Sequence, residues 1–426
     1  MYNIVKQKYE RKKVIIKKHK ELKILNFLNK EYHIFKQINS VSRQKNKKIK
    51  IKAPTTAKML FMGMFCREKS INQIIEKVHK RKKYRRLFDK KETIPKMHGF
   101  RDGIKDINLE DLKQINKNII RKAKENKIYR KGTIDRLVVV GIDGTESFGS
   151  YKKNWTNSFK CKIKNQKYIK GKKEDIEEEY HKQINVFARI VGKRPGIILG
   201  YEKITCNGKE GKQEYEPNVG IKLIEKLKKQ YGTGIDVIVG DAIYLNEKVI
   251  KAVKKEKYIG VFRLKENNRK IYEDAKGLFK IKKSKEFKYK GQKIKYWTDI
   301  FEYRGNKVRV IKYIEQEEKE IYVVCTDTKL KEETINKIIH ARWDIENEGF
   351  NELKNGWNMK HCYMADEKGI DVILQMIIMS YNLWEIYLYG HLHDFENRGM
   401  TKFGYIDEIR EKLYVANIDI ICFSSA

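Results

Sequence analysis

The stretch LVVVGID, residues 137–143, decides the fold of this 426-residue chain. Its run of apolar residues ends in an acid, a pattern typical of a strand buried on both faces in the middle of a sheet. The stretch VIVGD at 237–241 shows the same pattern. In α/β sheets, ligand-binding residues gather just outside the carboxyl ends of the strands. Asp143 and Asp241, each expected at the end of its strand, are therefore predicted to lie close together.

The segments around these two strands predict an α/β core. Strand-like segments lie at 185–191 and 196–204, and another strand is expected at 258–265. Asn218 and Asn246 are each predicted to cap a helix between strands. The resulting order of strand, strand, strand, helix, strand and helix is typical of an RNase H-like core.

Strong basicity marks the chain as a whole and its N-terminal part in particular. Lys and Arg number 95 against 56 Asp and Glu, which gives a formal net charge of +39. Phosphate backbones are the usual partners of such a charge. Basic clusters at Lys6–Lys23, Arg43–Lys52 and Lys80–Arg86 fall among predicted helices, one of which Ser70 is expected to cap. We interpret this part as DNA-binding; a set of solvated charged faces is the alternative.

Five regions are predicted along the chain. Segments that alternate polar and apolar residues around Gly291 and Gly305 predict hairpins, so an insertion of β structure interrupts the α/β pattern before helical periodicity returns. The predicted regions are a basic helical DNA-binding region at 1–130, the first part of the core at 131–269, a β-rich insertion at 270–326, the catalytic helix and end of the core at 327–395, and a C-terminal tail at 396–426.

Cysteine usage and hydropathy limit the remaining classes of protein. The six cysteines are scattered and form no C-x-x-C pair, which argues against a zinc site and a disulfide framework. The N-terminus lacks the apolar region of a signal peptide. Polar residues interrupt the apolar stretch Val372–Tyr389, which predicts a buried helix and no membrane span. His391 and His393 form an H-x-H pair that we expect at the surface. A cytoplasmic protein fits these features best.

A third acid completes the chemical pattern in the stretch HARWDIENEGFNELK, residues 340–354. Arg342 and Glu346 are four residues apart and share one helix face. Three carboxylates form a hard oxygen site for two Mg²⁺ ions, which clamp the oxygens of a phosphoryl displacement when they lie about 3.5–4 Å apart. Glu348 is the alternative third acid, and for either aspartate alone a turn or cap role is the simpler interpretation.

Taken with IDGTE at 142–146 and VGDAIY at 239–244, the string RWDIE resembles the DDE transposases of bacterial insertion sequences. The resemblance is to the group that carries a Y-x2-R-x3-E-x6-K signature, and it covers about residues 55–390. The acids of the three blocks are 98 and 105 residues apart, and the second gap is long because it holds the β-rich insertion.

The resemblance implies roles for six residues. Asp143, Asp241 and Glu346 would be the catalytic triad and would hold two Mg²⁺ ions, for which Mn²⁺ can substitute. Arg342, Lys354 and Trp297 would contact DNA. Trp297 would do so by stacking on a flipped base, with cross-strand packing as the alternative. Double-stranded DNA of transposon ends and target is the implied partner, and a homodimer, working at the bacterial nucleoid, the implied assembly.

The C-terminal part of the signature departs from the family pattern. The position of the signature Tyr holds Ile339, and the position of the Lys holds Leu353, with Lys354 one residue later. On a regular helix Lys354 projects about 80° away from the Glu346 face. We predict a π-type widening near Asn347–Gly349, which would turn Lys354 back. A regular helix without this lysine contact is the alternative.

The sequence thus predicts an α/β protein with an RNase H-like core, a β-rich insertion, a basic helical N-terminal region and C-terminal helices. Its predicted function is metal-dependent hydrolysis at transposon ends followed by strand transfer to target DNA. A nuclease that cuts without joining and a non-catalytic DNA-binding protein are the alternatives. Trp343, Phe350 and Trp357 are expected in the core around the catalytic helix, and Glu146 either tunes Asp143 or is a solvated turn residue.

Overall fold

The strand predicted at 137–143 is confirmed in the computed structural model of the chain, where it begins β1 (Val139–Ser150). β1 pairs in parallel with β7 (Val237–Gly240), and β7 pairs in parallel with β8 (Ile259–Leu264). All four residues of β7 are buried. Continuous apolar runs are required here because a central parallel strand is covered on both faces.

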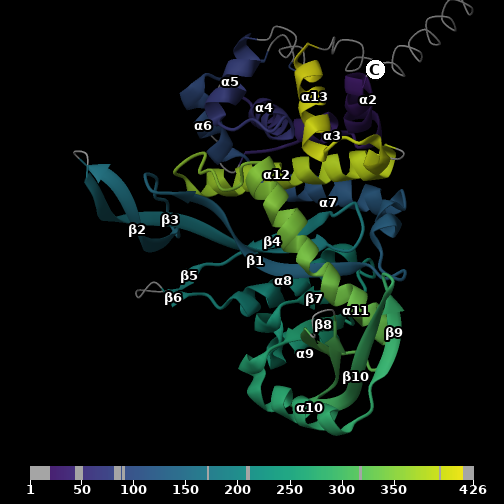
Figure 1. Cartoon of the computed structure of the whole chain (residues 1–426). Coiled ribbons are helices and arrows are strands. Elements are labelled where there is room, and N and C mark those ends of the chain that lie inside the picture. The colour runs from purple at the N-terminus through teal and green to yellow at the C-terminus, as the bar shows by residue number, and fades with distance from the viewer. Residues whose placement is uncertain are drawn as a thin grey trace, which may run out of the picture. The chain divides into compact units, whose positions relative to one another are not determined.

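Two compact units make up the chain (Figure 1). Unit 1 comprises Met1–Lys122, Lys153–Thr156 and Leu353–Ala426, and unit 2 comprises Ala123–Lys152 and Asn157–Glu352. The structure describes residues 20–43, 51–80, 88, 92–169, 172–207, 212–315, 319–392 and 395–415. Most of the three basic clusters of the N-terminal region lies outside these residues.

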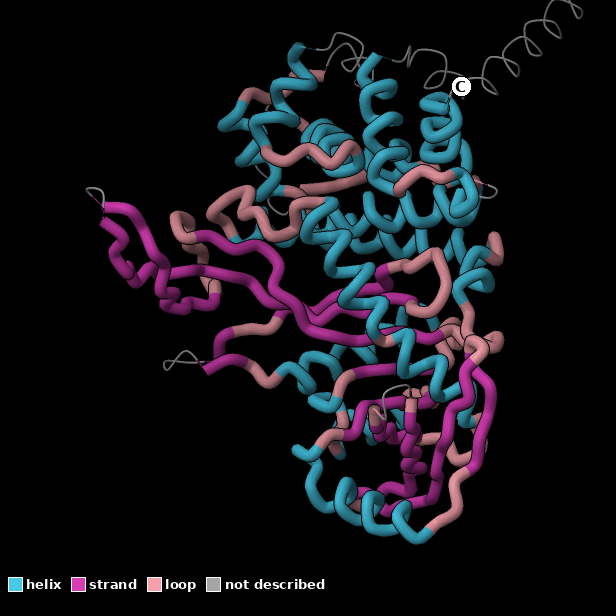
Figure 2. The backbone as a smooth tube through the Cα atoms, viewed as in Figure 1, coloured by secondary structure: helices cyan, strands magenta, loops and turns pink. Residues whose placement is uncertain are grey.

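A ten-stranded sheet runs through unit 2 in the part of the chain that the structure describes (Figure 2). The strand order is β2-β3-β1-β7-β8-β12-β11-β10-β9, and β4 also pairs with β3. The bounds of the remaining strands are β2 (Phe159–Ile169), β3 (Lys172–Ile190), β4 (Ile198–Lys203), β9 (Lys285–Tyr289), β10 (Gln292–Tyr303), β11 (Asn306–Ile314) and β12 (Glu320–Cys325). A separate pair joins β5 (Cys206–Asn207) and β6 (Lys212–Gln213).

The predicted β-rich insertion at 270–326 differs from the structure in two ways. Its first residues form a helix, α10 (Arg269–Ile281). Its strands continue the core sheet, because β12 pairs antiparallel with β8 and places Cys325 opposite Val261. The hairpins β9-β10 and β10-β11 are confirmed. Local alternation predicts hairpins, but it carries no information on which distant strand a hairpin joins.

Short helices connect the strands of unit 2. They are η3 (Ile128–Gly132), α8 (Glu216–Tyr231), η4 (Ala242–Tyr244), α9 (Glu247–Lys255), η5 (Glu266–Asn268), α11 (Glu332–Ala341) and η7 (Ile345–Phe350). The Asn246 cap is confirmed, since its side chain accepts a hydrogen bond from the Val249 N–H. The Asn218 cap is wrong: α8 begins two residues earlier, with Pro217 in its first turn, a position that suits the fixed φ of proline.

Unit 1 is helical in its described residues. Its elements are α2 (Lys20–Asn26), η1 (Phe27–Glu31), α3 (Ile34–Asn39), α4 (Ala53–Phe65), α5 (Ile71–Lys80), α6 (Met97–Asp106), α7 (Leu109–Glu125), η8 (Glu352–Gly356), α12 (Glu367–Glu385), η9 (Ile386–His391), η10 (Phe395–Arg398) and α13 (Lys402–Val415). The predicted Ser70 cap is confirmed by a bond from the Gln73 N–H to its hydroxyl. α13 lies within the predicted C-terminal tail at 396–426 and agrees with the C-terminal helices that the sequence predicts; its Ile406 and Ile409 are buried.

The long apolar helix α12 lies in the core of unit 1, as its interrupted hydropathy predicts. Residues 372–388 are all buried. The Trp384 indole stacks on Phe65 of α4 at 4.7 Å between ring centroids and donates a hydrogen bond to the Phe65 carbonyl. No helix within the described residues is long and apolar enough to span a membrane.

Candidate active site

The register of β1 and β7 places Asp143 and Asp241 at the same level of the sheet. The last parallel pair joins Gly141 to Val239, and each aspartate follows two residues later. Asp241 comes directly after β7, as predicted. Asp143 does not end its strand: β1 continues to Ser150 because β3 pairs with it on the other side. Asp143 therefore lies beside the end of the short strand β7, which Asp241 follows.

Asp143 carries an unusually raised pKa. Burial raises the pKa of its carboxyl to about 7, with further contributions from the negative charges of Glu346 and Glu216. The charge of Arg342 and a hydrogen bond from the Gly144 N–H, at 2.9 Å, act in the opposite direction. A carboxylate beside other carboxylates is stabilised as an anion by nearby positive charge and by the hydrogen bonds that it accepts.

The pKa of Asp241, in contrast to that of Asp143, is lowered. Burial acts to raise the pKa of its carboxyl, but the Ala242 N–H, the Lys265 ammonium and the charge of Arg342 together lower it below the usual value. The Lys265 Nζ lies 3.2 Å from the Asp241 carboxylate. The two aspartates therefore differ in environment, and Asp241 is the one that is paired with a lysine.

Glu346 lies in η7 and bonds to Arg342 as the four-residue spacing predicts. The Arg342 guanidinium donates to the Glu346 carboxylate at 2.6 Å, and the arginine side chain is only 6% exposed. The positive charge of the same guanidinium also acts to lower the pKa of Asp143 and that of Asp241. Arg342 thus links all three predicted triad residues electrostatically, in addition to its predicted contact with DNA.

The predicted π-type widening is confirmed. η7, over Ile345–Phe350, is a π-helix and includes the predicted position, and a second π-helical segment, η8, carries Lys354. Gly349 permits the wide turn because a Cβ there would lie 2.7 Å from Cδ of Arg189. The side chain of Arg189 is buried, so it has no room to withdraw.

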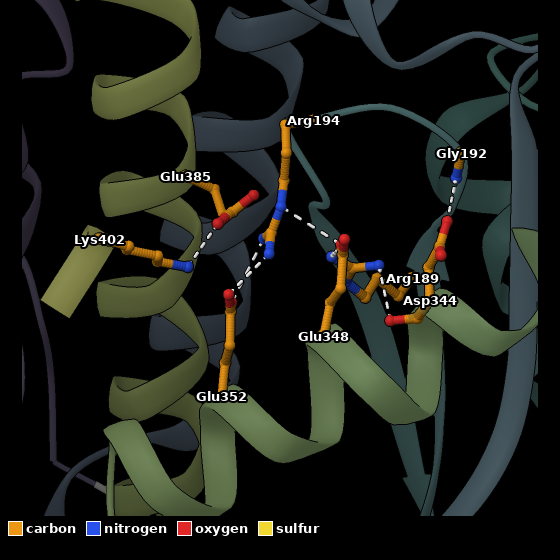
Figure 3. A network of polar contacts seen from close by, with 8 residues as sticks. All are labelled: Arg189, Gly192, Arg194, Asp344, Glu348, Glu352, Glu385 and Lys402. Carbon is orange, nitrogen blue, oxygen red and sulfur yellow. Dashed lines mark hydrogen bonds and ion pairs between the residues drawn. The ribbon is translucent and has the colours of Figure 1, made fainter. Parts of the chain in front are cut away.

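Ion pairs hold the η7 segment to the end of β3 (Figure 3). Arg189 donates to the Glu348 carboxylate at 2.9 Å and to the Asp344 carbonyl at 3.1 Å. Arg194 contacts Glu348 at 3.2 Å and Glu352 at 2.6 Å. Glu348 therefore pairs with two arginines, whereas Glu346 pairs with Arg342. Figure 3 also shows a second ion pair, within unit 1, between Glu385 and Lys402.

The donor set suits a hard divalent cation, because all three predicted ligands are carboxylates. Among the described residues, however, no three acidic, histidine or cysteine side chains lie close enough together to hold a metal ion. The Arg342–Glu346 bond gives a physical reason, since it satisfies Glu346 with an internal cation. The three acids share one end of the sheet but do not form a closed metal centre.

Burial is predicted for three aromatic residues near the catalytic helix, and the structure confirms it for two of them. Phe350 and Trp357 are buried, as expected. Trp343 is 49% exposed instead of buried, and it lies against the Arg342 guanidinium at 4.4 Å. Trp297 donates its indole N–H to the Lys282 carbonyl and faces Lys312, its cross-strand neighbour, at 5.1 Å. These contacts agree with the packing alternative for Trp297.

Glu146 and His391, two polar residues singled out in the sequence, each have a partner in the structure. Glu146 accepts a hydrogen bond from the Tyr180 hydroxyl at 2.6 Å, which gives it a role in the β1-β3 ladder. His391 pairs with Glu31 at 3.2 Å, while His393 lies outside the described residues. Sequence reasoning missed Glu216, whose charge acts on Asp143. The acid directly before Pro217 in EPNVG indicates a helix start, but nothing in the sequence connects it to Asp143.

The comparison with known families matches residues 170–383, about half of the chain, to the family described as Transposase DDE domain. The chain belongs to this family. Asp241 and Glu346 lie inside the matched residues, and Asp143 precedes them. Among solved structures, the chain is similar to the piggyBac transposase in a cryo-EM structure of its synaptic complex with hairpin DNA. The TM-score is 0.45 and the identity 11%, over 95% of this chain and 82% of that chain. None of the curated proteins compared with the chain matches it.

Proposed function

We propose that this transposase cuts DNA at the ends of a bacterial mobile element and joins the freed 3′-hydroxyl to target DNA. Asp143, Asp241 and Glu346 are the proposed catalytic triad, and Mg²⁺ or Mn²⁺ the proposed cofactor. The proposed site of action is nucleoid DNA in the cytoplasm. A homodimer follows from the reaction, because two element ends have to be held together for joining.

One observation carries this proposal beyond the family assignment: all three acids interact with the same buried guanidinium. Arg342 bonds to Glu346 and acts on the charges of Asp143 and Asp241. The three residues come from β1, the end of β7 and η7, which are far apart in the sequence. The strand order β4-β3-β1-β7-β8, with β1, β7 and β8 parallel and β3 antiparallel, supports an RNase H-like core for this site.

The residues of the site have separate tasks in the proposed reaction. A bound divalent cation supplies Lewis-acid stabilisation of the phosphodiester oxygens and activation of water. Asp143 and Asp241 hold their carboxylates at one level of the sheet, and Glu346 joins them once its bond to Arg342 loosens. The released guanidinium then offers planar N–H donors suited to a phosphate group.

DNA affinity is proposed to come from the basic residues and not from the triad. With a net charge of +39, the chain attracts phosphate backbones at long range. Arg342 and Lys354 are the proposed contacts near the scissile strand. Trp297 remains the proposed base-stacking residue, although stacking on a base would require it to leave Lys282 and Lys312.

The Asp241→Asn variant tests the function. We expect cleavage of an element end to fall at least about 100-fold with Mg²⁺, because a neutral amide no longer offsets cation charge. Asp274→Asn, at an exposed position of α10, is the matched control and should cut normally. DNA affinity should be unchanged in both variants. Undiminished cleavage by the Asp241 variant would contradict the proposal.

Product analysis separates transposition from the nuclease alternative. A transposase should yield strand-transfer products that link element ends to target DNA, whereas a nuclease yields cut ends alone. The substrate can be taken from inverted repeats that flank the gene. Cleavage without joined product, under conditions in which a known transposase joins, would favour the nuclease.

A further inference from the structure

A fourth carboxylate lies at the proposed active site. Glu216 is the first residue of α8, the helix between β4 and β7 in sequence, and it belongs to unit 2 together with the triad. Neither the family signature nor the spacing of the acids predicts it. Its surroundings in the fold nevertheless connect it to both Asp143 and Asp241.

Backbone packing places Glu216 against the residue that follows Asp143. A Cβ built on Gly144 would lie 2.5 Å from Cδ of Glu216, and 2.6 and 2.7 Å from its two carboxylate oxygens. The carboxylate therefore occupies the space that any other residue type at position 144 would fill. Gly144 lets an acid on a neighbouring helix approach the backbone beside Asp143.

Tyr244, at the end of η4, holds the Glu216 carboxylate in place. Its hydroxyl donates a hydrogen bond to Oε1 of Glu216 at 2.7 Å, and its ring is completely buried. Tyr244 ends the short helix η4, which begins directly after Asp241. No hydrogen bond or ion pair to Oε2 of Glu216 is found among the described residues. One oxygen is thus held by the protein, and the other remains for a ligand.

The charge balance of this region favours a cation. The negative charges of Glu346 and Glu216 repel a negative charge on Asp143, while Arg342 provides positive charge nearby. Lys265 pairs with Asp241. Neighbouring carboxylates repel one another, and a bound cation relieves this repulsion without protonation of either group. We propose that Glu216 is a further ligand of the divalent cation, beside Asp143, and that Tyr244 positions it.

A structural role for Glu216 is the competing interpretation, because an acid in the first turn of a helix interacts favourably with the helix dipole. Glu247 provides a matched control. It is the first residue of α9, which follows β7, and it pairs with Lys251 at 2.5 Å. Replacing Glu247 removes the dipole interaction without touching the triad.

Mn²⁺ binding to the full-length protein tests this inference, which rests on the proposed function. Electron paramagnetic resonance of free Mn²⁺ gives the affinity without a DNA substrate. We expect Tyr244→Phe to weaken Mn²⁺ binding about tenfold, because loss of a residue that positions a metal ligand costs about 10–100-fold, and Glu216→Gln to weaken it more. Glu216→Asp should recover part of the affinity, whereas Glu247→Gln should bind as the unaltered protein does.

The outcomes separate this inference from the function. Asp143→Asn should abolish tight Mn²⁺ binding if the triad holds the cation. If Asp143→Asn weakens binding and Glu216→Gln does not, the fourth ligand is wrong while the triad stands. If neither variant changes binding, the proposed metal site itself is wrong, and this inference with it. Equal loss of binding in the Glu216 and Glu247 variants would indicate a structural role and overturn the inference.

Discussion

At the scale of single residues, Arg342 and Arg189 divide the acids of the η7 segment between two tasks. Arg342 bonds to Glu346 and acts on both aspartates, whereas Arg189 bonds to Glu348 and to the Asp344 carbonyl. Both arginines are buried. A buried guanidinium strongly favours a paired acid, because an unpaired charge in the interior is costly. Two glutamates only two residues apart therefore pair with different arginines, and we expect them to have different functions.

Glutamine substitutions should separate these functions. We expect Glu346→Gln to lower cleavage at least about 100-fold, because a neutral amide does not offset the charge of a bound cation. Glu348→Gln should retain cleavage within a few-fold but lower the free energy of unfolding by about 1–2 kcal/mol, since Arg189 and Arg194 lose a charged partner. Cleavage assays and urea denaturation measure the two effects. The reverse pattern would assign the catalytic role to Glu348.

The sequence predicts pairs of residues that are near one another in the chain and misses pairs that only the fold creates. The four-residue spacing correctly places Arg342 beside Glu346 on one helix face. Glu216 has no such spacing to Asp143, because their proximity depends on how α8 lies against β1. Trp343 is exposed although its apolar side chain predicts burial, because it covers the guanidinium of Arg342 instead of packing in the core.

At the scale of elements, the wide turn of η7 depends on one glycine. Gly349 lies against the Arg189 side chain, which is fixed at its far end by Glu348 and Asp344. A larger residue at this position would collide with this arginine. The close packing of η7 against Arg189 therefore requires glycine at position 349.

Alanine at position 349 should destabilise unit 2. Its Cβ would lie 2.7 Å from Cδ of Arg189, so overpacking should cost about 1–3 kcal/mol. Gly277→Ala in α10 is the matched control, because no atom lies within 4 Å of a Cβ there. It should stabilise the protein by about 0.5–1 kcal/mol, as expected for alanine in a helix. Denaturation midpoints measure both changes. A Gly349→Ala variant that is as stable as the Gly277→Ala variant would contradict the close packing at Gly349.

Local signals determine how well each element can be predicted. Asn246 caps α9 because its side chain reaches an N–H three residues on, a contact that the sequence alone specifies. Asn218 has the same residue type, but Pro217 moves the start of α8 upstream. The strand β2 and the length of β3 are not predicted, because polar residues dominate both segments and their pairing stabilises them.

At the scale of the whole molecule, the predicted insertion illustrates what composition cannot specify. The hairpins around Gly291 and Gly305 form as expected, yet β12 returns to pair with β8 and extends the core sheet. The sequence predicts the parallel centre from its continuous apolar runs. It does not predict the edge to which later strands attach, since an antiparallel edge requires only compatible alternation.

The net charge of the molecule leads to a last prediction, on the salt dependence of DNA binding. The log–log slope of affinity against salt should approach −0.9 per phosphate neutralised, because each contact releases condensed counterions. For six to ten phosphate contacts, affinity should fall about 10³–10⁵-fold between 50 and 200 mM salt. Fluorescence anisotropy with a labelled element-end duplex measures the slope, and a duplex of scrambled sequence provides the comparison. Asp241→Asn should give the same slope as the unaltered protein, because the proposed role of Asp241 is to bind a metal ion and not a phosphate group. An affinity that is flat across this range would show that the surplus of 95 basic over 56 acidic residues does not act through phosphate contacts.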